Sequence, residues 1–370
     1  MKIVLTGGGT GGHIIPLITV AKKIQENAGV SGEVEFLFIG PKGKLEDDLM
    51  AGAGIPTKGV LVGKMRRYFS FHHFLDPFKV LIGIIQSLWH LLVFMPDAIF
   101  SKGGYASVPV VLVGWLYRIP ILIHESDSIP GMTNDVLGKL STRVAVSYPE
   151  AEKDFAATQV VLTGNPLRAD INQGDAATGR AKFSFTDSKK IIYITGGSQG
   201  ARNINDKIIN ILPELLHKYQ IIHQTGRNNY DEVVHRAAEM GIKAGREGYV
   251  PIAFAGEELK DIYAMADLII SRGSANTISE IAANAKPAIL VPLINSANDH
   301  QKMNAYSIAR TGGCIVLEEN NLGENLLLGK IEEIMNSEEL RAGLSQNIRG
   351  FYHPDAAEKI AAGILSMIAR

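Results

Sequence analysis

The sequence predicts an α/β fold made of two Rossmann-like halves, and three observations lead to this prediction. The chain has 370 residues, which exceeds the usual length of one domain and indicates two. Short apolar runs alternate with stretches of helical periodicity, as in βαβ units that build a parallel sheet. An apolar run that leads into glycines and then into a helical stretch occurs near residue 7 and again near residue 196.

The first half of the chain shows this alternation from its beginning. Short apolar runs predict strands at residues 3–5, 34–39, 98–101, 121–124, 143–147 and 160–163. Helical periodicity predicts helices at residues 14–27 and 45–53. Residues 78–95 form the most hydrophobic stretch, but Lys79, Gln86 and His90 interrupt it. A membrane-spanning helix needs about 20 apolar residues, so we predict an amphipathic or buried helix there.

The alternation begins again in the second half, after the turn cluster Gly-Asn-Pro at 164–166. Further strands are predicted at residues 190–195, 220–223, 268–271 and 288–291. We therefore place the first domain at residues 1–163 and the second at residues 164–350.

Composition excludes several classes of protein. Apolar residues make up 46% and charged residues 20%, which is a globular and not a disordered composition. The 37 basic and 38 acidic residues give a net charge of −1, without the basic excess that nucleic acid binding favours. The single cysteine, Cys314, cannot form a disulfide framework or a multi-cysteine metal site. The first residues lack the pattern of a secretory signal, so we expect a cytoplasmic protein.

The first glycine-rich segment is GGGTGGH, from Gly7 to His13, between a predicted strand and a predicted helix. Glycines let the backbone approach a ligand, and a helix start favours phosphate. The spacing Gly-x-Gly-x-x-Gly also fits a dinucleotide fingerprint, which requires a carboxylate after the second strand. That strand ends Phe-Ile-Gly-Pro-Lys at 38–42, which counts against NAD. The alternative is a tight turn with a histidine at the helix start.

The second half has two similar segments. GGSQGAR at 196–202 offers backbone N–H groups and the Ser198 hydroxyl to a diphosphate. SRGSANTISE at 271–280 places Glu280 in an early helical turn, where a carboxylate can accept from both ribose hydroxyls. The alternative for Glu280 is a helix-capping or dipole partner. Phosphate-binding loops in both halves predict one nucleotide diphosphate ligand in a cleft.

Seven motifs in order resemble those of the MurG family of N-acetylglucosaminyltransferases, which act on undecaprenyl-pyrophosphoryl-MurNAc-pentapeptide. They are GGGTGGH at 7–13, SKGGYASVP at 101–109, HESDSIPGMTN at 124–134, GNPLR at 164–168, GGSQGARNIN at 196–205, SRGSANTISE at 271–280 and DHQKMNA at 299–305. The resemblance spans essentially the whole chain. It implies the GT-B fold, with two Rossmann-like domains facing each other across a cleft and a C-terminal helix at about 351–370 packing on the first domain.

The resemblance also implies the reaction. Members transfer N-acetylglucosamine from UDP-N-acetylglucosamine to lipid I with inversion at the sugar carbon, giving lipid II for peptidoglycan. They use no cofactor and no bound metal, and the absence of Asp-x-Asp in this sequence agrees with that. The implied partners are the two substrates and an anionic membrane surface, with other cell-wall synthesis and division proteins left open.

Individual residues receive roles from the same resemblance. His13 and Glu125 would face the reacting acceptor hydroxyl, and the choice of the base between them stays open. The unperturbed pKa of a histidine suits His13 for that role. Asp127 stands where many members have asparagine, so it can only accept hydrogen bonds. The other implied substrate-binding residues are Thr10, Gly11, Gly12, Arg168, Ser198, Gly256, Ala275, Asn276, Thr277, Ile278, Ser279, Glu280, His300 and Gln301, with Asn304 alongside.

A basic and aromatic segment at residues 58–79 predicts attachment to the cytoplasmic face of the cell membrane. It has five basic side chains, Lys64, Arg66 and Arg67 among them, against one acid, Asp76, with aromatic residues between them. Such a composition suits an anionic membrane surface. The alternative is a solvated loop that covers a core helix.

Three other functions remain open on sequence alone. A UDP-N-acetylglucosamine 2-epimerase would share the fold and the donor but would need no lipid, so it would not explain the basic and aromatic segment. A diacylglycerol glycosyltransferase is a second alternative. A non-catalytic nucleotide-binding subunit would not need His13 and Glu280 together with both glycine loops.

Overall fold

The computed structural model describes residues 1–8, 11–28, 33–63, 72–156, 158–197, 200–294 and 296–368. The chain divides into two compact units. Unit 1 comprises Met1–Arg168 and His353–Arg370, and unit 2 comprises Ala169–Tyr352. The sequence boundary after residue 163 lies five residues before the point at which the chain leaves unit 1.

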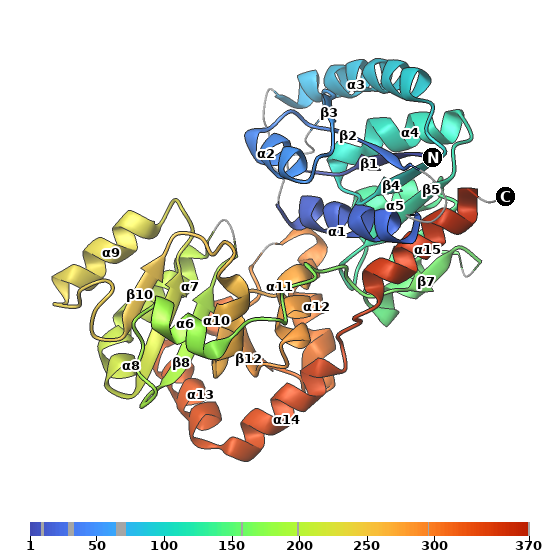
Figure 1. Ribbon diagram of the computed structural model, residues 1–370. Helices are drawn as coiled ribbons and strands as arrows, with labels where there is room; N and C mark the ends of the chain where they lie inside the picture. The colour runs from blue at the N-terminus through green and yellow to red at the C-terminus, as the bar shows by residue number, and fades with distance from the viewer. Residues whose placement is uncertain are drawn as a thin grey trace. The chain divides into compact units, whose positions relative to one another are not determined.

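Unit 1 has a seven-stranded parallel sheet of order β3-β2-β1-β4-β5-β6-β7 (Figure 1). Its strands are β1 (Lys2–Thr6), β2 (Glu35–Gly40), β3 (Thr57–Gly59), β4 (Ala98–Ser101), β5 (Ile121–Glu125), β6 (Arg143–Val146) and β7 (Val160–Leu162). Its helices are α1 (Gly11–Ala28), α2 (Lys44–Gly52), α3 (His72–Phe94), α4 (Val108–Leu116), α5 (Met132–Gly138) and α15 (Ala356–Ile368). Helices cover both faces, which is why the central strands are continuous apolar runs.

The two faces of this sheet carry separate apolar cores. Ile14 and Leu17 of α1 pack with Ile360 and Ile364 of α15 on one face, and these two helices lie side by side (Figure 1). Helices α3, α4 and α5 cover the other face. Hydrogen bonds join α15 to α1 and β6, from Asn27 to Glu358 at 2.7 Å and from Arg143 to Ser366 at 2.9 Å. The last helix is thus part of unit 1.

Unit 2 repeats the architecture with a six-stranded parallel sheet of order β10-β9-β8-β11-β12-β13. Its strands are β8 (Lys190–Thr195), β9 (Tyr219–Gln224), β10 (Tyr249–Ile252), β11 (Leu268–Ser271), β12 (Ala288–Leu290) and β13 (Ile315–Val316). Its helices are α6 (Ala176–Lys182), α7 (Arg202–Asn210), α8 (Leu212–Lys218), α9 (Tyr230–Glu239), α10 (Leu259–Met265), α11 (Ala275–Ala283), α12 (His300–Arg310), α13 (Glu324–Asn336) and α14 (Glu338–Arg349).

The strand order places both glycine-rich segments at the point where it reverses. In unit 1, β1 lies between β2 and β4, and in unit 2, β8 lies between β9 and β11. Each glycine-rich segment follows the central strand, β1 or β8, at its carboxyl end. Ligands of open α/β sheets bind at this switch point. The predicted fold class, two Rossmann-like sheets, is confirmed.

Helix α3 was predicted to be amphipathic or buried, but it exposes an apolar face. Its inner face is buried at Gly83, Ser87 and Leu91, but its outer face is also apolar and is exposed. The exposed side chains on that face are Phe78, Leu81, Ile82, Ile85, Trp89, Leu92 and Val93. Residues Asp76–Phe94 are long and apolar enough to cross a membrane, the one such helix among the described residues, and 17% of that window is buried.

Candidate functional site

In unit 1, three predicted site residues lie together at the carboxyl end of the sheet. His13 is in the first turn of α1, which follows β1, while Glu125 ends β5 and Asp127 comes two residues later. Because β1, β4 and β5 are neighbours in the sheet, these residues share one edge. The imidazole of His13 lies over Gly104, whose missing Cβ would stand 3.4 Å from Nε2. Gly11 and Gly12 form the start of the same helix, and Thr10 lies outside the described residues.

Both oxygens of the Glu125 carboxylate accept hydrogen bonds from the segment that follows β5. Oε1 accepts from the backbone N–H of Asp127 at 2.9 Å. Oε2 accepts from the N–H of Gly131 at 3.2 Å and from Nδ2 of Asn134 at 2.9 Å. Glu125 is only 3% exposed. The carboxylate therefore organises residues 126–131 into a loop that carries Asp127.

Lys102 completes this group, and the sequence prediction missed it. It directly follows β4, and its backbone N–H donates to the Thr6 carbonyl of β1 at 2.9 Å. Its side chain is 3% exposed and packs on the first glycine-rich segment, 3.2 Å from the position of a Cβ on Gly7. Lysine is almost never fully buried without a functional or ionic reason. The signal in the sequence was the lysine itself, within SKGGYASVP.

The charges of this group change the acid–base properties expected of His13. Burial and the Lys102 ammonium lower the pKa of His13 to about 4, against the opposing effect of Asp127. The unperturbed pKa assumed from sequence is therefore wrong for this position. Burial and Asp127 raise the pKa of Glu125, while its hydrogen bonds and Lys102 oppose the rise. Burial lowers the pKa of Lys102 to about 8, although both carboxylates favour its charged form.

The GNPLR segment meets the same edge of unit 1. The buried His124 ring donates from Nε2 to the Gly164 carbonyl at 3.0 Å, and the Ser147 hydroxyl lies 3.2 Å from the same nitrogen. Arg168 is the last residue of unit 1 before the chain enters unit 2. The sequence prediction had assigned it to the second domain.

In unit 2, the glycine-rich segment after β8 is tightly built. A Cβ on Gly196 would stand 2.1 Å from the Ala201 nitrogen, and one on Gly200 would stand 2.2 Å from the Thr225 oxygen. By contrast, among the described residues beyond its chain neighbours, none has an atom within 4 Å of the Cβ position of Gly197. Packing therefore explains two of these glycines, and open space at Gly197 allows a ligand to approach the backbone. Ser198 lies outside the described residues.

Gln224, at the end of β9, links this segment to the Gly256 loop. Its Nε2 donates to the Gly197 carbonyl at 3.2 Å, and its Oε1 accepts from Tyr193 at 2.9 Å and from the Ala255 N–H at 3.1 Å. Gln224 is 5% exposed. Its signal in the sequence was a polar residue that ends an apolar strand.

Glu280 lies in the second turn of α11, with its Oε2 accepting from the Tyr263 hydroxyl at 2.8 Å. Ser274 is the N-cap of this helix, because its Oγ accepts from the Thr277 N–H at 3.4 Å. The alternative of Glu280 as the capping residue is therefore wrong. Along the predicted binding run, Asn276, Thr277 and Glu280 are half-buried, whereas Ala275, Ile278 and Ser279 are buried. Ile278 has no exposed side chain to offer a substrate.

Helix α12 brings the DHQ motif beside the start of α11. Asn304 is fully buried and donates from Nδ2 to the Gly273 carbonyl at 3.2 Å. Gln301 accepts at Oε1 from the Leu293 N–H at 3.1 Å. His300 is the first residue of α12. Asn304 thus holds the backbone before α11, and Gln301 presents its amide from a fixed position.

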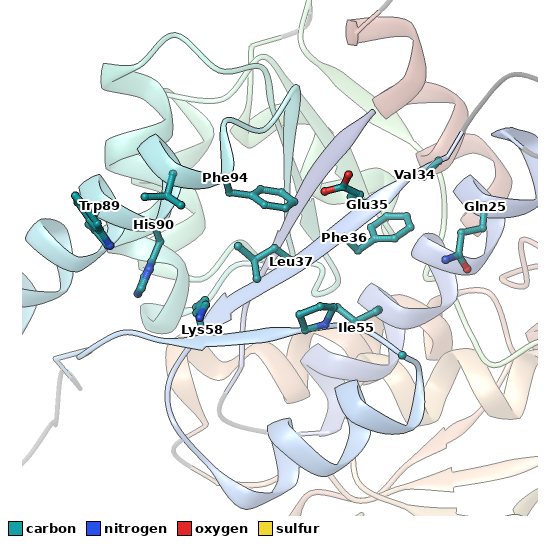
Figure 2. Close-up of a pocket in the computed structure, with 13 residues that line it drawn as sticks. Gln25, Val34, Glu35, Phe36, Leu37, Ile55, Lys58, Trp89, His90 and Phe94 are labelled. Carbon is teal, nitrogen blue, oxygen red and sulfur yellow. The ribbon is translucent and has the colours of Figure 1, made fainter.

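A pocket of about 550 Å³ lies elsewhere in unit 1, where β2 and β3 begin. Figure 2 shows Trp89, His90 and Phe94 of α3 beside Phe36 and Leu37 of β2. Because the predicted site residues of unit 1 lie at the carboxyl ends of its strands, this pocket lies at the other edge of the same sheet. Trp89 also belongs to the exposed face of α3.

Comparison with known proteins identifies the family. The family model described as glycosyltransferase family 28 N-terminal domain matches residues 3–146, and the one for the family 28 C-terminal domain matches residues 191–360. The chain belongs to glycosyltransferase family 28. The two matches fall in units 1 and 2 respectively, apart from the last residues of the second match. This family 28 chain is therefore a glycosyltransferase.

Relatives and solved structures agree with this assignment. The UDP-N-acetylglucosamine--N-acetylmuramyl-(pentapeptide) pyrophosphoryl-undecaprenol N-acetylglucosamine transferase of Clostridium perfringens is 38% identical over 339 residues, 91% of each chain. The crystal structure of Acinetobacter baumannii MurG matches with a TM-score of 0.75 and 25% identity, covering 99% of both chains. The Neisseria meningitidis UDP-GlcNAc 2-epimerase matches with a TM-score of 0.72 at 13% identity, over 99% of this chain and 100% of that chain. The epimerase likeness extends to the fold alone.

Proposed function

We propose that this family 28 chain transfers N-acetylglucosamine from UDP-N-acetylglucosamine to the muramyl hydroxyl of lipid I, forming lipid II. The observation that carries the proposal is the 38% identity, over 91% of both chains, to a Clostridium perfringens transferase with that printed name. The geometry supports it with a group of acid–base residues in unit 1 and a nucleotide-type site in unit 2.

The donor nucleotide binds to unit 2. The Glu280 carboxylate, held by Tyr263, accepts from a ribose hydroxyl. Backbone N–H groups at the start of α11 bind the diphosphate, and Ser198 and Arg168 are the further diphosphate contacts that the resemblance implies. The backbone around Gly256 contacts the uracil. The diphosphate gains negative charge as UDP departs, and the α11 N-terminus stabilises that charge.

The sugar is recognised by α12. Because the Leu293 N–H occupies Oε1 of Gln301, the side-chain amide is oriented, and its Nε2 donates to a hydroxyl of the acetamido sugar. His300 lies beside it at the helix start. Asn304 acts on the backbone of Gly273 instead of the sugar.

The acceptor binds to unit 1, where His13 takes the proton of the muramyl hydroxyl. A lowered pKa keeps the imidazole neutral at physiological pH, so that it can accept a proton. Glu125 accepts three hydrogen bonds from its own loop, which suits a role in orienting that loop. Asp127, carried by the loop, accepts a hydrogen bond from the acceptor sugar.

The exposed apolar face of α3 attaches the enzyme to the cytoplasmic face of the membrane, where lipid I is presented. An exposed patch of large apolar side chains on this scale is typical of protein or membrane contact. The basic segment before it adds attraction to anionic lipids. Of that segment, Lys64, Arg66 and Arg67 lie outside the described residues.

A transfer assay with labelled UDP-N-acetylglucosamine and a lipid I analogue tests the function. We expect the labelled sugar to appear on the analogue with release of UDP. Epimerisation of free UDP-N-acetylglucosamine without an acceptor would replace this proposal by the 2-epimerase. Transfer to diacylglycerol but not to the analogue would replace it by a diacylglycerol glycosyltransferase, and donor binding without turnover would indicate a non-catalytic subunit.

A further inference from the structure

Four titratable side chains from a helix, a strand and two loops lie at one edge of the unit 1 sheet. They are His13 of α1, Lys102 after β4, Glu125 of β5 and Asp127 after β5. Lys102 and Glu125 are each 3% exposed. Two carboxylates, one ammonium and an imidazole thus share this edge of the sheet, and water screens little of the charge of the two buried side chains, Lys102 and Glu125.

The position of Lys102 is fixed by the backbone on both of its sides. Its own N–H donates to the Thr6 carbonyl at 2.9 Å, and the next N–H, of Gly103, donates to the Ser101 hydroxyl at 3.1 Å. Its Cβ lies 3.2 Å from the Cβ position of Gly7. A side chain larger than glycine at residue 7 would displace it. The structure thus holds one cation at a defined place beside the glycine-rich segment.

We propose that Lys102 is a positioning residue of the transfer reaction, which acts through its charge on His13 and on the paired carboxylates Glu125 and Asp127. The positioning role rests on the proposed function, because it requires the transfer reaction. The charge interaction rests on the geometry of unit 1 alone. Lys102 is not a catalytic residue in this scheme, because the proton moves between the acceptor hydroxyl and His13.

The effect of the charge follows from its sign. The ammonium helps to lower the pKa of His13, which keeps the imidazole neutral at neutral pH, and it opposes the rise in the pKa of Glu125 that burial and Asp127 cause. Without it, the two carboxylates would repel each other, and the pKa of both His13 and Glu125 would rise. Lys102 also lowers the pKa of His124 on the neighbouring strand. Farther along the glycine-rich segment, Glu46 of α2 lies 3.6 Å from the Cβ position of Gly8.

The experiment compares Lys102→Met and Asp127→Asn with the wild type. NMR of ring-labelled histidines, with the His13 signal assigned by His13→Gln, follows the ionisation of His13 between pH 3.5 and 8. We expect the pKa of His13 to rise by about one unit in Lys102→Met, and in Asp127→Asn to fall so that less of the His13 titration remains above pH 3.5. The Lys102→Met/Asp127→Asn double variant should return toward the wild-type value.

The pH dependence of kcat/KM gives the second measurement. Its acid limb should move to higher pH in Lys102→Met and to lower pH in Asp127→Asn. Lys286→Met in unit 2, where a half-buried lysine bonds the Ala264 carbonyl, is the matched control and should move neither limb. If Lys102→Met does not fold, Lys102→Gln, which keeps a polar side chain but removes the charge, gives the same comparison.

Two results overturn the inference. One is an unchanged His13 titration in folded Lys102→Met and in Asp127→Asn. The other is a Lys102→Met variant whose activity falls without any shift of the acid limb, which indicates a purely structural lysine. Absence of transfer by the wild type would contradict the proposed function, whereas the NMR titration would still decide the charge interaction.

Discussion

Glu280 and its hydrogen bond from Tyr263 give a graded test of donor binding. We expect Glu280→Ala to raise the donor KM roughly ten- to a hundredfold, since a charged hydrogen bond contributes about 1.5–3 kcal/mol. Tyr263→Phe removes only the 2.8 Å bond that orients the carboxylate, so its donor KM should rise less. Steady-state kinetics with varied UDP-N-acetylglucosamine measure both effects. An unchanged donor KM in folded Glu280→Ala would contradict the ribose contact.

Substitutions of His13 and of Glu125 should have different effects on kcat and on stability. His13→Gln should lower kcat by about 10²- to 10⁴-fold, the usual contribution of a general base. Glu125→Gln should lower kcat less but also lower stability, because an amide NH₂ would face one of the three donors that the carboxylate now satisfies. Rates and thermal midpoints of the two variants provide the comparison. A larger kcat loss in Glu125→Gln, with no loss of stability, would reverse the two roles.

Because of His223, we expect the free energy of unfolding of unit 2 to fall at acidic pH. The ring is fully buried between Tyr249 and Asn205, and burial lowers its pKa to about 3. Since the unfolded chain binds a proton near pH 6.5 and the folded chain does not, this stability is complete above pH 6.5 and declines as the pH falls to about 3. The loss should reach about 2 kcal/mol at pH 5.

Urea unfolding at pH 7.5 and pH 5 measures that term in the wild type and in His223→Gln. The glutamine keeps a polar side chain in place but does not titrate. We expect the free energy of unfolding of unit 2 to fall less between the two pH values in the variant. Equal losses in both proteins would show that His223 does not carry the pH dependence.

The sequence predicted site residues by type and motif, but it could not show which side-chain oxygens already accept hydrogen bonds within the protein. Glu125 remains a candidate base beside His13, but the sequence could not show that three donors already bond to its oxygens. Burial is equally invisible along the chain, and for that reason Lys102 and the lowered pKa of His13 were missed. Glu280 is placed at an early helical turn as predicted, because the motif spacing fixes it.

At the scale of elements, the exposed face of α3 should decide membrane attachment. Leu81, Ile85 and Trp89 are 56%, 58% and 65% exposed, so serine at all three should leave the fold intact. Each large apolar side chain contributes about 1.5–3 kcal/mol when fully buried, so vesicle binding should weaken more than a hundredfold. Sedimentation with anionic vesicles measures this loss.

A matched control uses exposed apolar residues away from α3. Val161, Met240 and Leu326 are 51%, 43% and 42% exposed, and serine at these positions should leave vesicle binding unchanged. Undiminished sedimentation of the α3 variant would show that another surface attaches the enzyme. Equal losses in both triple variants would indicate non-specific partitioning.

The strands that the sequence did not predict share one property. β3, β10 and β13 all lie at sheet edges and have three, four and two residues. An edge strand of this length has too few residues for a periodic pattern, and Pro251 within β10 is tolerated because the strand pairs on one side only. The central strands, of three to six residues, are buried apolar runs, and the edge strand β7 is apolar as well, which is why their positions were predicted within one or two residues.

At the scale of the whole molecule, the two units should lose stability independently. Ile364 of α15 is fully buried in the core of unit 1, so Ile364→Ala should lower the free energy of unfolding of unit 1 by about 2–5 kcal/mol. Unit 2 has its own core and should keep its stability. Hydrogen exchange, assigned to each unit, measures both. Lys359→Ala, on the exposed part of the same helix, is the control, and a loss of protection in both units would refute independence.

Unit 2 is inserted into the sequence of unit 1, between β7 and α15. During translation, the ribosome therefore adds all of Ala169–Tyr352 before it reaches the helix that covers α1. At about 5–20 residues per second, this interval is on the order of tens of seconds. For that time the nascent chain displays Leu17 and its apolar neighbours without their cover. Unit 2, although synthesised later, can complete its fold first, and the N-terminal half is the part that a chaperone would need to shield.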